Sequence, residues 1–521
     1  YFKIMDKKRV KIKKNSEEEE NAHPIDYHDF GFRVNFKAEN YMTRNSSMVR
    51  KMIKDWGNTK KIFRYIKRFT FVRDDVPYKI DCSVVKGSHT KGKFIIPEFN
   101  IRDSEVFESE EHYEIELEVI RTKITSTETA LAKKNIFTGI KYVLAGMQES
   151  NYPISNSEKQ DILTDYIKLI YQSKEIPDKK KHKKLKDKAY VSSSDFVGPS
   201  SISLEMHHIV PVKHDEVDTI NIRENYVVTD KADGIRKLLY IAPNGKIYFI
   251  DLNMNVQFTG TISKNSDVFN TIFDGEHILN NKAGKFINLF LIFDVYYVNN
   301  KDYRSFPFIK KENLVYYDAK MDKTIFRYNV MNQTLMKIKY ESISSDKFAS
   351  LKIKPKSFRG NSNIFYGCKQ ILDGIKDGNM FDYETDGLIF TPIHKSVGLE
   401  TLGLKNGGSP VPRKVTWMSS LKWKPPEFNT IDFLVSTKKN EDKTDFVGNI
   451  FIDGKSFDHT KQNLKYKTLI LRVGYDETKH GYVNPCEDIL QNKLPEFTID
   501  NINNYRPVPF HPSDPVPQTP A

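Results

Sequence analysis

Residues 226–241, YVVTDKADGIRKLLYI, are the stretch around which the rest of the chain can be interpreted. The β-branched and aromatic residues 226–228 predict a strand, and residues 238–241 predict a second strand. Between them lies a polar turn that contains Lys231, Asp233, Gly234 and Arg236. The stretch therefore predicts a strand, a tight turn and a returning strand, with a lysine in the turn.

Lys231 is a candidate nucleophile. A protonated lysine is a poor nucleophile, so its amino group must be desolvated or set beside other cations. Arg236, Lys422 and Lys424 could supply that cationic environment. Gly234 would let the chain turn back tightly enough to hold Lys231 over a phosphate. The alternative is an ordinary charged hairpin, which a short KxDGxR match alone does not exclude.

Four further stretches follow in order along the chain. They are 273–276 (FDGE), 291–295 (LIFDV), 385–389 (TDGLI) and 421–424 (LKWK). Together with Lys231-Ala-Asp-Gly they resemble the motifs of covalent nucleotidyltransferases, the mRNA capping guanylyltransferases and polynucleotide ligases. The resemblance implies that Lys231 attacks the α-phosphate of GTP or ATP and becomes a lysyl-nucleotide.

The same resemblance implies roles for other residues. Arg236 and Glu276 are expected to bind the ribose, and Phe293 is expected to pack near the guanine. Asp386 would bind a metal. Lys422 and Lys424 would stabilise the charge of the α-phosphate as pyrophosphate leaves. The expected nucleotide-binding set is Asp233, Arg236, Glu276, Phe293, Lys422 and Lys424.

Towards the N-terminus, alternating residues predict β-strands. Glu114, Glu116 and Glu118 are spaced by two, so they point to one side of one strand, with apolar residues on the other. Three like charges in a row repel each other unless they are solvated or share a hard cation with oxygen ligands. A solvated outer face and a metal site therefore remain as alternatives. Upstream strands place Arg64, Arg68 and Lys79 as candidate phosphate ligands.

This combination resembles the triphosphate tunnel metalloenzymes, metal-dependent RNA triphosphatases of fungi and large DNA viruses. The resemblance implies a closed β-barrel in which Glu114, Glu116 and Glu118 hold Mg²⁺ or Mn²⁺. Stretches such as FRYIKRFTF and YEIELE are similar to capping enzymes of nucleocytoplasmic large DNA viruses. The family's second metal-binding strand is not found, and residues 17–20 are a poor substitute. We therefore expect an N-terminally truncated triphosphatase domain.

Composition sets broad limits. The chain has 521 residues and a formal net charge of +13, which suits a polyanionic partner such as RNA but also simple solubility. Its three cysteines are scattered, which favours a reducing compartment over a disulfide framework or a cysteine-rich zinc site. No run reaches the length of a transmembrane helix, so no membrane association is expected.

The predicted fold class is multidomain α+β. Residues 1–190 are expected to form the tunnel β-barrel, residues 191–424 a nucleotidyltransferase domain of antiparallel sheets with helices, and residues 425–521 a partial OB-fold with a proline-rich tail. Two helices are predicted within 127–172, and another over 363–377 beneath the strand of Asp386. The basic run 178–188 suits a solvated linker better than a dedicated RNA contact. His207 and His208 are expected to be structural.

The predicted function is that of an mRNA capping enzyme fragment. It would remove the γ-phosphate of triphosphate-ended RNA and transfer GMP from GTP through Lys231. The alternatives are an ATP-dependent DNA or RNA ligase and a non-catalytic RNA-binding subunit. The resemblance implies GTP as substrate, Mg²⁺ or Mn²⁺ as cofactor, nascent RNA as partner, a downstream methyltransferase domain or subunit, and a host cytoplasmic factory or virion as location. The family's last motif, Arg-x-Asp-Lys, has no acceptable match, since Arg472 and Asp476 have the wrong spacing.

Overall fold

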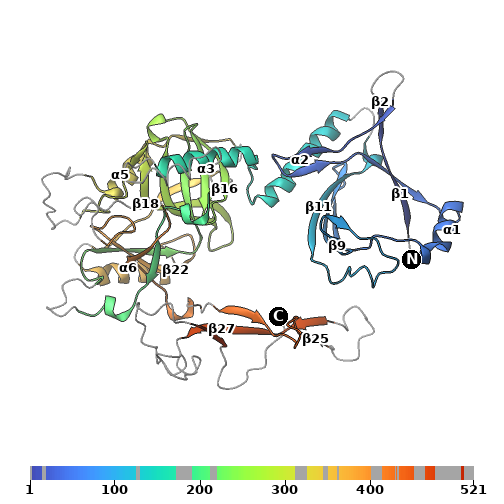
Figure 1. The fold of residues 1–521 in the computed structure, drawn as a ribbon. Coiled ribbons are helices and arrows are strands. Elements are labelled where there is room, and N and C mark those ends of the chain that lie inside the picture. The colour runs from blue at the N-terminus through green and yellow to red at the C-terminus, as the bar shows by residue number, and fades with distance from the viewer. Residues whose placement is uncertain are drawn as a thin grey trace. The chain divides into compact units, whose positions relative to one another are not determined.

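The computed structural model describes residues 3–13, 19–124, 129–171, 191–211, 220–310, 325–343, 350–360, 363–378, 380–400, 413–428, 430, 433–450, 464–475 and 506–509. The chain divides into two units, Tyr1–Trp423 and Lys424–Ala521. The basic run 178–188 lies outside the described residues, and so does the proline-rich tail apart from residues 506–509. Figure 1 colours the helices and strands from blue at the N-terminus to red at the C-terminus.

The N-terminal part is built on a three-stranded antiparallel sheet with the order β11-β8-β7. These strands span Arg64–Val72 (β7), Tyr78–Gly87 (β8) and His112–Val119 (β11). The other described strands of this part form two-stranded pairs: β1 (Ile4–Arg9) with β6 (Lys37–Met42), β2 (Lys11–Lys13) with β3 (Glu19–Asn21), β4 (Ile25–Tyr27) with β5 (Phe32–Val34), and β9 (Thr90–Lys91) with β10 (Phe94–Ile95). The described strands do not close into a barrel, so the expected tunnel stays a prediction.

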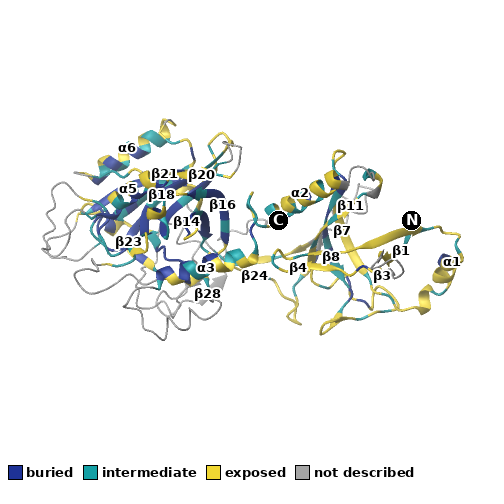
Figure 2. Cartoon of the chain, turned by 90° about the horizontal axis from the view of Figure 1, so that it is seen from above, coloured by how far each residue is buried: buried dark blue, intermediate teal, exposed yellow. Residues whose placement is uncertain are grey.

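The second part of the first unit contains an eight-stranded sheet with the order β19-β18-β17-β14-β15-β16-β20, and β21 pairs with β18. Its strands span Ile235–Ile241 (β14), Lys246–Asp251 (β15), Val256–Ser263 (β16), Thr271–Asn280 (β17), Phe286–Val298 (β18), Lys301–Asp302 (β19), Tyr340–Ser342 (β20) and Lys352–Pro355 (β21). Figure 2 shows β14 and β16 in the colour of buried residues, whereas β4 is mostly exposed. This sheet provides the main hydrophobic core.

A four-stranded sheet with the order β12-β23-β22-β13 carries the lysine motif. Its strands span Ser200–Ser203 (β12), Tyr226–Ala232 (β13), Thr385–Pro392 (β22) and Thr416–Trp423 (β23). The predicted returning strand is β14, but β13 and β14 lie in different sheets and do not pair. The prediction of a tight turn back between the two strands was therefore wrong, and so was the alternative of a charged hairpin. The chain crosses from one sheet to the other at Asp233 and Gly234, and Lys231 lies near the end of β13.

Gly234 is needed at this crossing for a reason other than turn geometry. Its φ is not positive, and a Cβ there would lie 2.8 Å from the His277 carbonyl oxygen and 2.9 Å from Cγ of Glu276. Both residues belong to β17. Glycine therefore allows the crossing segment to approach the neighbouring sheet closely.

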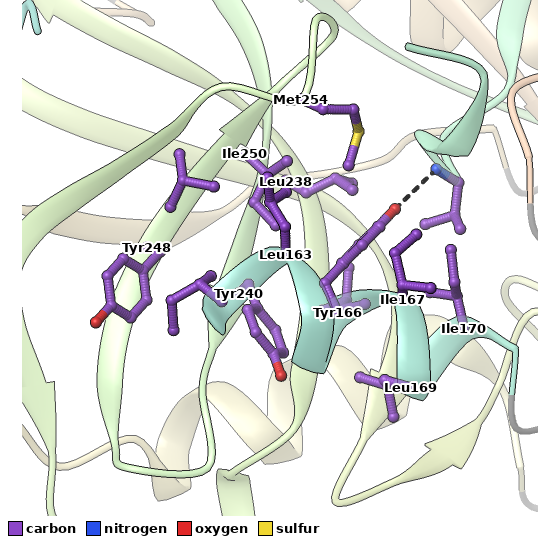
Figure 3. Packing of buried hydrophobic residues seen from close by; sticks show 14 of the residues in the cluster. Leu163, Tyr166, Ile167, Leu169, Ile170, Leu238, Tyr240, Tyr248, Ile250 and Met254 are labelled. Carbon is purple, nitrogen blue, oxygen red and sulfur yellow. Dashed lines mark hydrogen bonds between the residues drawn. The ribbon is translucent and has the colours of Figure 1, made fainter. Parts of the chain in front are cut away.

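Two helices follow the N-terminal sheet, as predicted: α2 (Thr129–Met147) and α3 (Asn156–Ile170). α2 lies against β11, where a Cβ at Gly139 would meet the side chains of Tyr78 and Leu117. α3 packs instead on the eight-stranded sheet, with Leu163 and Tyr166 in one cluster with Leu238 and Tyr240 (Figure 3). The domain boundary expected at residue 190 stays a prediction. The buried side chains of α3, however, pack in the hydrophobic core of the eight-stranded sheet.

The other α-helices among the described residues are α1 (Ser47–Lys54), α5 (Arg327–Lys337) and α6 (Ile364–Lys376). α6 matches the predicted helix: its residues Ile364 and Ile371 share a core cluster with Leu388 and Phe390 of β22, the strand of Asp386. Asn363 caps its N-terminus by accepting a hydrogen bond from the Phe365 amide at 2.9 Å. Met331 of α5 packs in the core on the opposite side of the eight-stranded sheet from α3.

The second unit contains strands β24 (Leu434–Thr437), β25 (Val447–Ile450), β26 (Leu464–Lys467), β27 (Leu469–Tyr475) and β28 (Arg506–Pro509). They form a sheet with the order β24-β27-β28 and a β25-β26 pair. Antiparallel strands were expected here, but the described ones do not establish an OB-fold. None of the described helices in the whole chain is both long and apolar enough to span a membrane.

Candidate active site

Lys231 and Asp386 face each other across a β-bulge. The pairing of β13 with β22 runs from Asp230↔Leu388 to Ala232↔Thr385, so Lys231 alone stands opposite two residues of β22. One of the two is Gly387, whose φ of 147° suits glycine. The bulge re-aims the side chain of Asp386, which accepts hydrogen bonds from Lys231 Nζ at 2.6 and 2.8 Å.

This ion pair is partly buried, with 22% of the Lys231 side chain and 10% of the Asp386 side chain exposed. The amino group is therefore held in one place, at the surface of the sheet, and remains accessible to a ligand. An ammonium group has no lone pair, so Nζ must lose a proton before it can act as a nucleophile.

Arg236 forms a bidentate ion pair with Asp274. Nε and Nη2 of Arg236 lie 3.0 and 2.5 Å from the two carboxylate oxygens, and Nη1 donates to the Pro199 carbonyl at 2.7 Å. Tyr296 donates a further hydrogen bond to Asp274, which is fully buried. Asp274 lies in the predicted FDGE motif, but it was not predicted as a site residue. Arg236 is thus fixed by the protein, and its predicted contact with a ribose stays a prediction.

Glu276 lies beside Arg236, with which it is paired across β14 and β17. Burial raises the pKa of Glu276 to about 7, against the lowering influence of the cations of Lys356, Arg236 and Lys231. Because the charge of Lys231 is among them, Glu276 lies close enough to the candidate nucleophile to interact with it electrostatically. A half-buried carboxyl group of this kind can accept a hydrogen bond from a hydroxyl group, the role predicted for it.

Phe293 also occupies a bulge. Asp274 pairs with Asp294, and Gly275 pairs with Ile292, so Phe293 is the extra residue of β18. Its ring lies 5.6 Å from the guanidinium carbon of Arg236. The next residue, Asp294, is held by the buried Arg327 of α5 through bonds of 2.9 and 3.0 Å. The predicted position of Phe293 beside the nucleotide base is compatible with this arrangement.

The other predicted nucleotide ligands lie at different places. Lys422 of β23 is exposed and pairs with Ile389 of β22, next to the bulge at Asp386. Asp233 is exposed at the crossing between the two sheets, where its amide donates to the Glu384 carbonyl at 2.9 Å. Lys424 is the first residue of the second unit. The structure therefore gathers Lys422 with Lys231 and Asp386 in one sheet.

Lys356 is a residue that the sequence analysis missed. It is buried and donates to the carbonyl oxygen of Asp230 at 2.6 Å and to its carboxylate at 2.9 Å. Tyr383 donates to the same carboxylate at 3.2 Å. This network lies one residue before Lys231 on β13. Nothing local in the sequence signals it, because the partners are separated by 126 and 153 positions.

A divalent cation fits the chemistry of this site. Mg²⁺ is commonly held by one or two carboxylates together with the phosphates of a substrate. Asp386 is the carboxylate nearest to Lys231, and it would be the protein ligand. Among the described residues no group of three acidic, histidine or cysteine side chains forms a site by itself.

The N-terminal sheet carries a separate ladder of charges. Arg64 pairs with Glu114 at 2.6 Å, Arg68 with Glu116 at 2.9 Å, and Lys79 with Glu118 at 2.9 Å. All six predicted residues thus share one face of the β7-β8-β11 sheet. The paired glutamates are between 37% and 55% exposed. The expected alternation is confirmed, but each predicted metal ligand contacts a predicted phosphate ligand.

Asp81 lies at the centre of this ladder, fully buried. It pairs with Arg68 at 3.1 Å and Lys79 at 3.2 Å and accepts from Thr70 at 2.6 Å. Burial alone would raise the pKa of Asp81, but the hydrogen bonds from Thr70 and Lys79 hold it below its ordinary value. Asp81 was not predicted as a site residue from the sequence. Three carboxylates do not converge here, so the described residues do not by themselves fit a metal centre.

Lys231 is thus held on a carboxylate at a bulge, with an arginine, a glutamate and an aromatic ring on the adjoining sheet. In comparison with known proteins, residues 168–402 match the model of the mRNA capping enzyme, catalytic domain. The predicted resemblance to viral capping enzymes is confirmed by this match and by the relatives that follow.

The chain is 25% identical over 458 residues to a probable mRNA-capping enzyme of Acanthamoeba polyphaga mimivirus, covering 83% of this chain and 33% of that protein. It is 26% identical over 262 residues to the mRNA-capping enzyme subunit alpha of Schizosaccharomyces pombe, covering 47% of this chain and 54% of that protein. An mRNA-capping enzyme of Danio rerio is 26% identical over 245 residues, covering 44% of this chain and 34% of that protein. The chain thus spans between a third and about half of these relatives.

Proposed function

We propose that this chain is an mRNA guanylyltransferase that transfers GMP from GTP to the 5′ end of RNA through a lysyl-GMP intermediate on Lys231. The observation that carries the proposal is the contact between Lys231 and Asp386 across the β13–β22 bulge. The match of residues 168–402 to the capping enzyme catalytic domain supports it.

The chemistry consists of two displacements at one phosphorus atom. The deprotonated Nζ of Lys231 attacks the α-phosphorus of GTP, an N–P bond forms, and the P–O bond to pyrophosphate breaks. A terminal phosphate oxygen of diphosphate-ended RNA then attacks the same phosphorus, and the N–P bond breaks. The lysine nitrogen leaves as a neutral amine after taking up a proton.

The residues of this chain would contribute positioning and charge. Asp386 holds Nζ in place before attack, and Lys422 would stabilise charge that develops on the phosphoryl oxygens. Glu276 would accept a hydrogen bond from a ribose hydroxyl group, and Phe293 would stack on the base. A divalent cation bound with Asp386 and the triphosphate would supply charge neutralisation.

Nucleotide specificity separates this proposal from the ligase alternative. The full chain is incubated with GTP or ATP, each labelled in the α-phosphate, and then separated by denaturing electrophoresis. Labelling by GTP, with none by ATP, is expected. Labelling by ATP alone would assign the chain to the polynucleotide ligases. Absence of any covalent label would favour the non-catalytic RNA-binding alternative.

We propose a second activity, removal of the RNA γ-phosphate, for the N-terminal sheet. The specific observation is the row of cations, Arg64, Arg68 and Lys79, held on one sheet face by Asp81 and three glutamates. Such a row suits the binding of a triphosphate. Glu116→Ala should lower phosphate release from triphosphate-ended RNA and leave the melting temperature nearly unchanged, since Glu116 is 55% exposed. Release equal to wild type in Glu114→Ala, Glu116→Ala and Glu118→Ala would contradict this second activity.

The remaining expectations follow from these two activities. GTP and nascent RNA would be the substrates, with Mg²⁺ or Mn²⁺ as cofactor. A methyltransferase domain or subunit would act on the product. A viral factory in the host cytoplasm, or the virion, would be the location.

A further inference from the structure

A cavity of about 340 Å³ lies next to the lysine strand, and the proposed mechanism does not use it. Its volume falls in the range of about 300 to 1,000 Å³ that is usual for ligand pockets. Asp230 lines the cavity, whereas Lys231, Arg236, Glu276, Phe293 and Asp386 do not. Neighbouring residues of a strand point to opposite faces. The cavity is therefore separate from the face of β13 on which Lys231 meets Asp386.

Cations outnumber carboxylates in the walls. Lys352, Lys354, Lys356 and Arg359 line the cavity, against the carboxylates of Asp230 and Asp382. Lys356 and Asp230 neutralise each other in a buried pair at 2.9 Å. The guanidinium of Arg359 donates to the uncharged amide of Gln370 at 3.1 Å. Three positive charges therefore face the cavity with one exposed carboxylate among them.

Two of these cations form a row. Lys352 and Lys354 are both exposed on β21 and alternate with Ile353, which is buried in the core. They pair with Leu289 and Leu291 of β18, two further residues of the cavity wall. Within the described residues neither lysine makes an ion pair. Their ammonium groups are thus available to a polyanion.

The floor of the cavity is apolar and aromatic. Phe381 and Tyr383 line it, with ring centroids 5.4 Å apart. Tyr383 belongs to the hydrophobic cluster that contains Leu291, and Phe381 packs against that cluster. Tyr383 is fixed through its hydroxyl group, which donates to Asp230. A positively charged rim beside aromatic side chains is the combination that proteins use for single-stranded nucleic acid, with bases on the rings and phosphates on the cations.

We propose that this cavity binds a nucleotide of the acceptor RNA, downstream of the 5′ end that receives GMP. This proposal rests on the proposed function. Lys352 and Lys354 would contact backbone phosphates, and Phe381 would offer a surface for a base. Asp230, the residue before Lys231, lines the cavity. An RNA strand held there would therefore lie close to the reaction centre without occupying it.

The test compares RNA binding with nucleotide transfer in the full chain. The double variant Lys352→Ala/Lys354→Ala should bind a short single-stranded diphosphate-ended RNA about fivefold more weakly. The slope of log affinity against log salt concentration should fall by about 1.4, since each phosphate contact to a single strand accounts for about 0.7. Fluorescence anisotropy of a labelled RNA across a salt series measures both quantities.

A second measurement, of GMP transfer, shows whether the double variant is impaired in RNA binding or in the reaction with GTP. The RNA concentration for half-maximal GMP transfer should rise by a similar factor, and lysyl-GMP formation from GTP alone should change by less than twofold. The matched control is Lys337→Ala, which removes an exposed lysine in the last turn of α5, a helix whose core contacts do not include the cavity walls. Lys337→Ala should change neither the RNA concentration for half-maximal GMP transfer nor lysyl-GMP formation.

Three outcomes would overturn the proposal. RNA binding and its salt slope equal to wild type would show that the cavity does not hold RNA. An equal loss of lysyl-GMP formation would show that the two lysines serve the GTP site. An effect of the same size in Lys337→Ala would show general electrostatic attraction. Because RNA binding is measured without GTP, it can be scored even if Lys231 forms no adduct.

Discussion

At the scale of single residues, Glu276 shows how the fold changes the chemistry of a predicted side chain. The sequence identified Glu276 as an acidic residue at the ribose, but its protonation depends on burial, which only the packed structure provides. Its pKa of about 7 is far above the ordinary value of 4.5 for a glutamate side chain. The folded protein thus retains a proton on Glu276 at pH values where the unfolded chain has released it.

This difference predicts a pH dependence of stability. Between pH 4.5 and 7 the folded state binds more protons than the unfolded state at this group, so stability falls as the pH rises through that window. Glu276→Gln removes the ionisation. Its melting temperature should therefore match wild type near pH 4.5 and exceed it at pH 8, measured by calorimetry. A difference that stays constant with pH would contradict the assignment of a raised pKa.

Other residues of the site fall into two groups: those that a short sequence motif identifies, and those whose role depends on partners far away in the sequence. Lys231, Asp386 and Lys422 were identifiable because each lies in a short motif. Lys356 was not, because it lies in no short motif and its partner Asp230 is 126 positions away. Asp274 and Asp81 were visible as residues on the right strand, yet their burial and their arginine partners depend on pairing between strands. The site roles assigned from the sequence stay predictions.

At the scale of elements, the largest difference between prediction and structure is the crossing at Asp233 and Gly234. Two strands separated by two residues, one of them glycine, ordinarily indicate a hairpin. Here β13 pairs with β22 and β14 pairs with β15 and β17, so pairing with distant strands overrides the local signal. The helices were predicted more successfully, because the helical periodicity of α3 and α6 is a local property. Which sheet α3 covers could not be read from that periodicity.

α3 offers a test of this packing. Tyr166 is fully buried; it donates to the Asp195 carbonyl at 2.8 Å and accepts from the Val197 amide at 3.2 Å. Tyr166→Phe leaves both backbone groups without that partner, which should lower the free energy of unfolding by about 1–3 kcal/mol. Urea denaturation gives this value. The control Lys168→Ala removes an exposed side chain of the same helix and should cost less than about 0.5 kcal/mol. Equal effects in the two variants would contradict the docking of α3 through Tyr166.

At the scale of the whole molecule, two sets of charged residues lie on two different sheets. The ladder around Asp81 belongs to the β7-β8-β11 sheet, and Lys231 belongs to the four-stranded sheet. The sequence predicted the shared face of the glutamates from their spacing, and the set around Lys231 from a resemblance to covalent nucleotidyltransferases. It could not predict whether the N-terminal strands close into a barrel or whether the second unit is an OB-fold, because closure depends on strand pairing over long distances in the chain.

Separate sheets predict separable activities. Lys231→Ala should abolish GMP transfer and leave γ-phosphate release from triphosphate-ended RNA within about twofold of wild type. Glu116→Ala should show the reverse pattern. Labelled γ-phosphate release and labelled GMP transfer are measured on the same protein preparations. Equal loss of both activities in a variant with wild-type melting would show that the two sets form one shared site.

The central claim, that Lys231 is the nucleophile, is tested most directly by mapping the covalent nucleotide. The full chain is incubated with GTP and Mg²⁺ or Mn²⁺, digested under conditions that preserve the phosphoramidate bond, and analysed by tandem mass spectrometry. We predict that the peptide containing Lys231 carries one GMP group, that Lys231→Arg carries none, and that the adduct disappears on acid treatment. A GMP group on a different lysine, or an undiminished adduct in folded Lys231→Arg, would contradict the account.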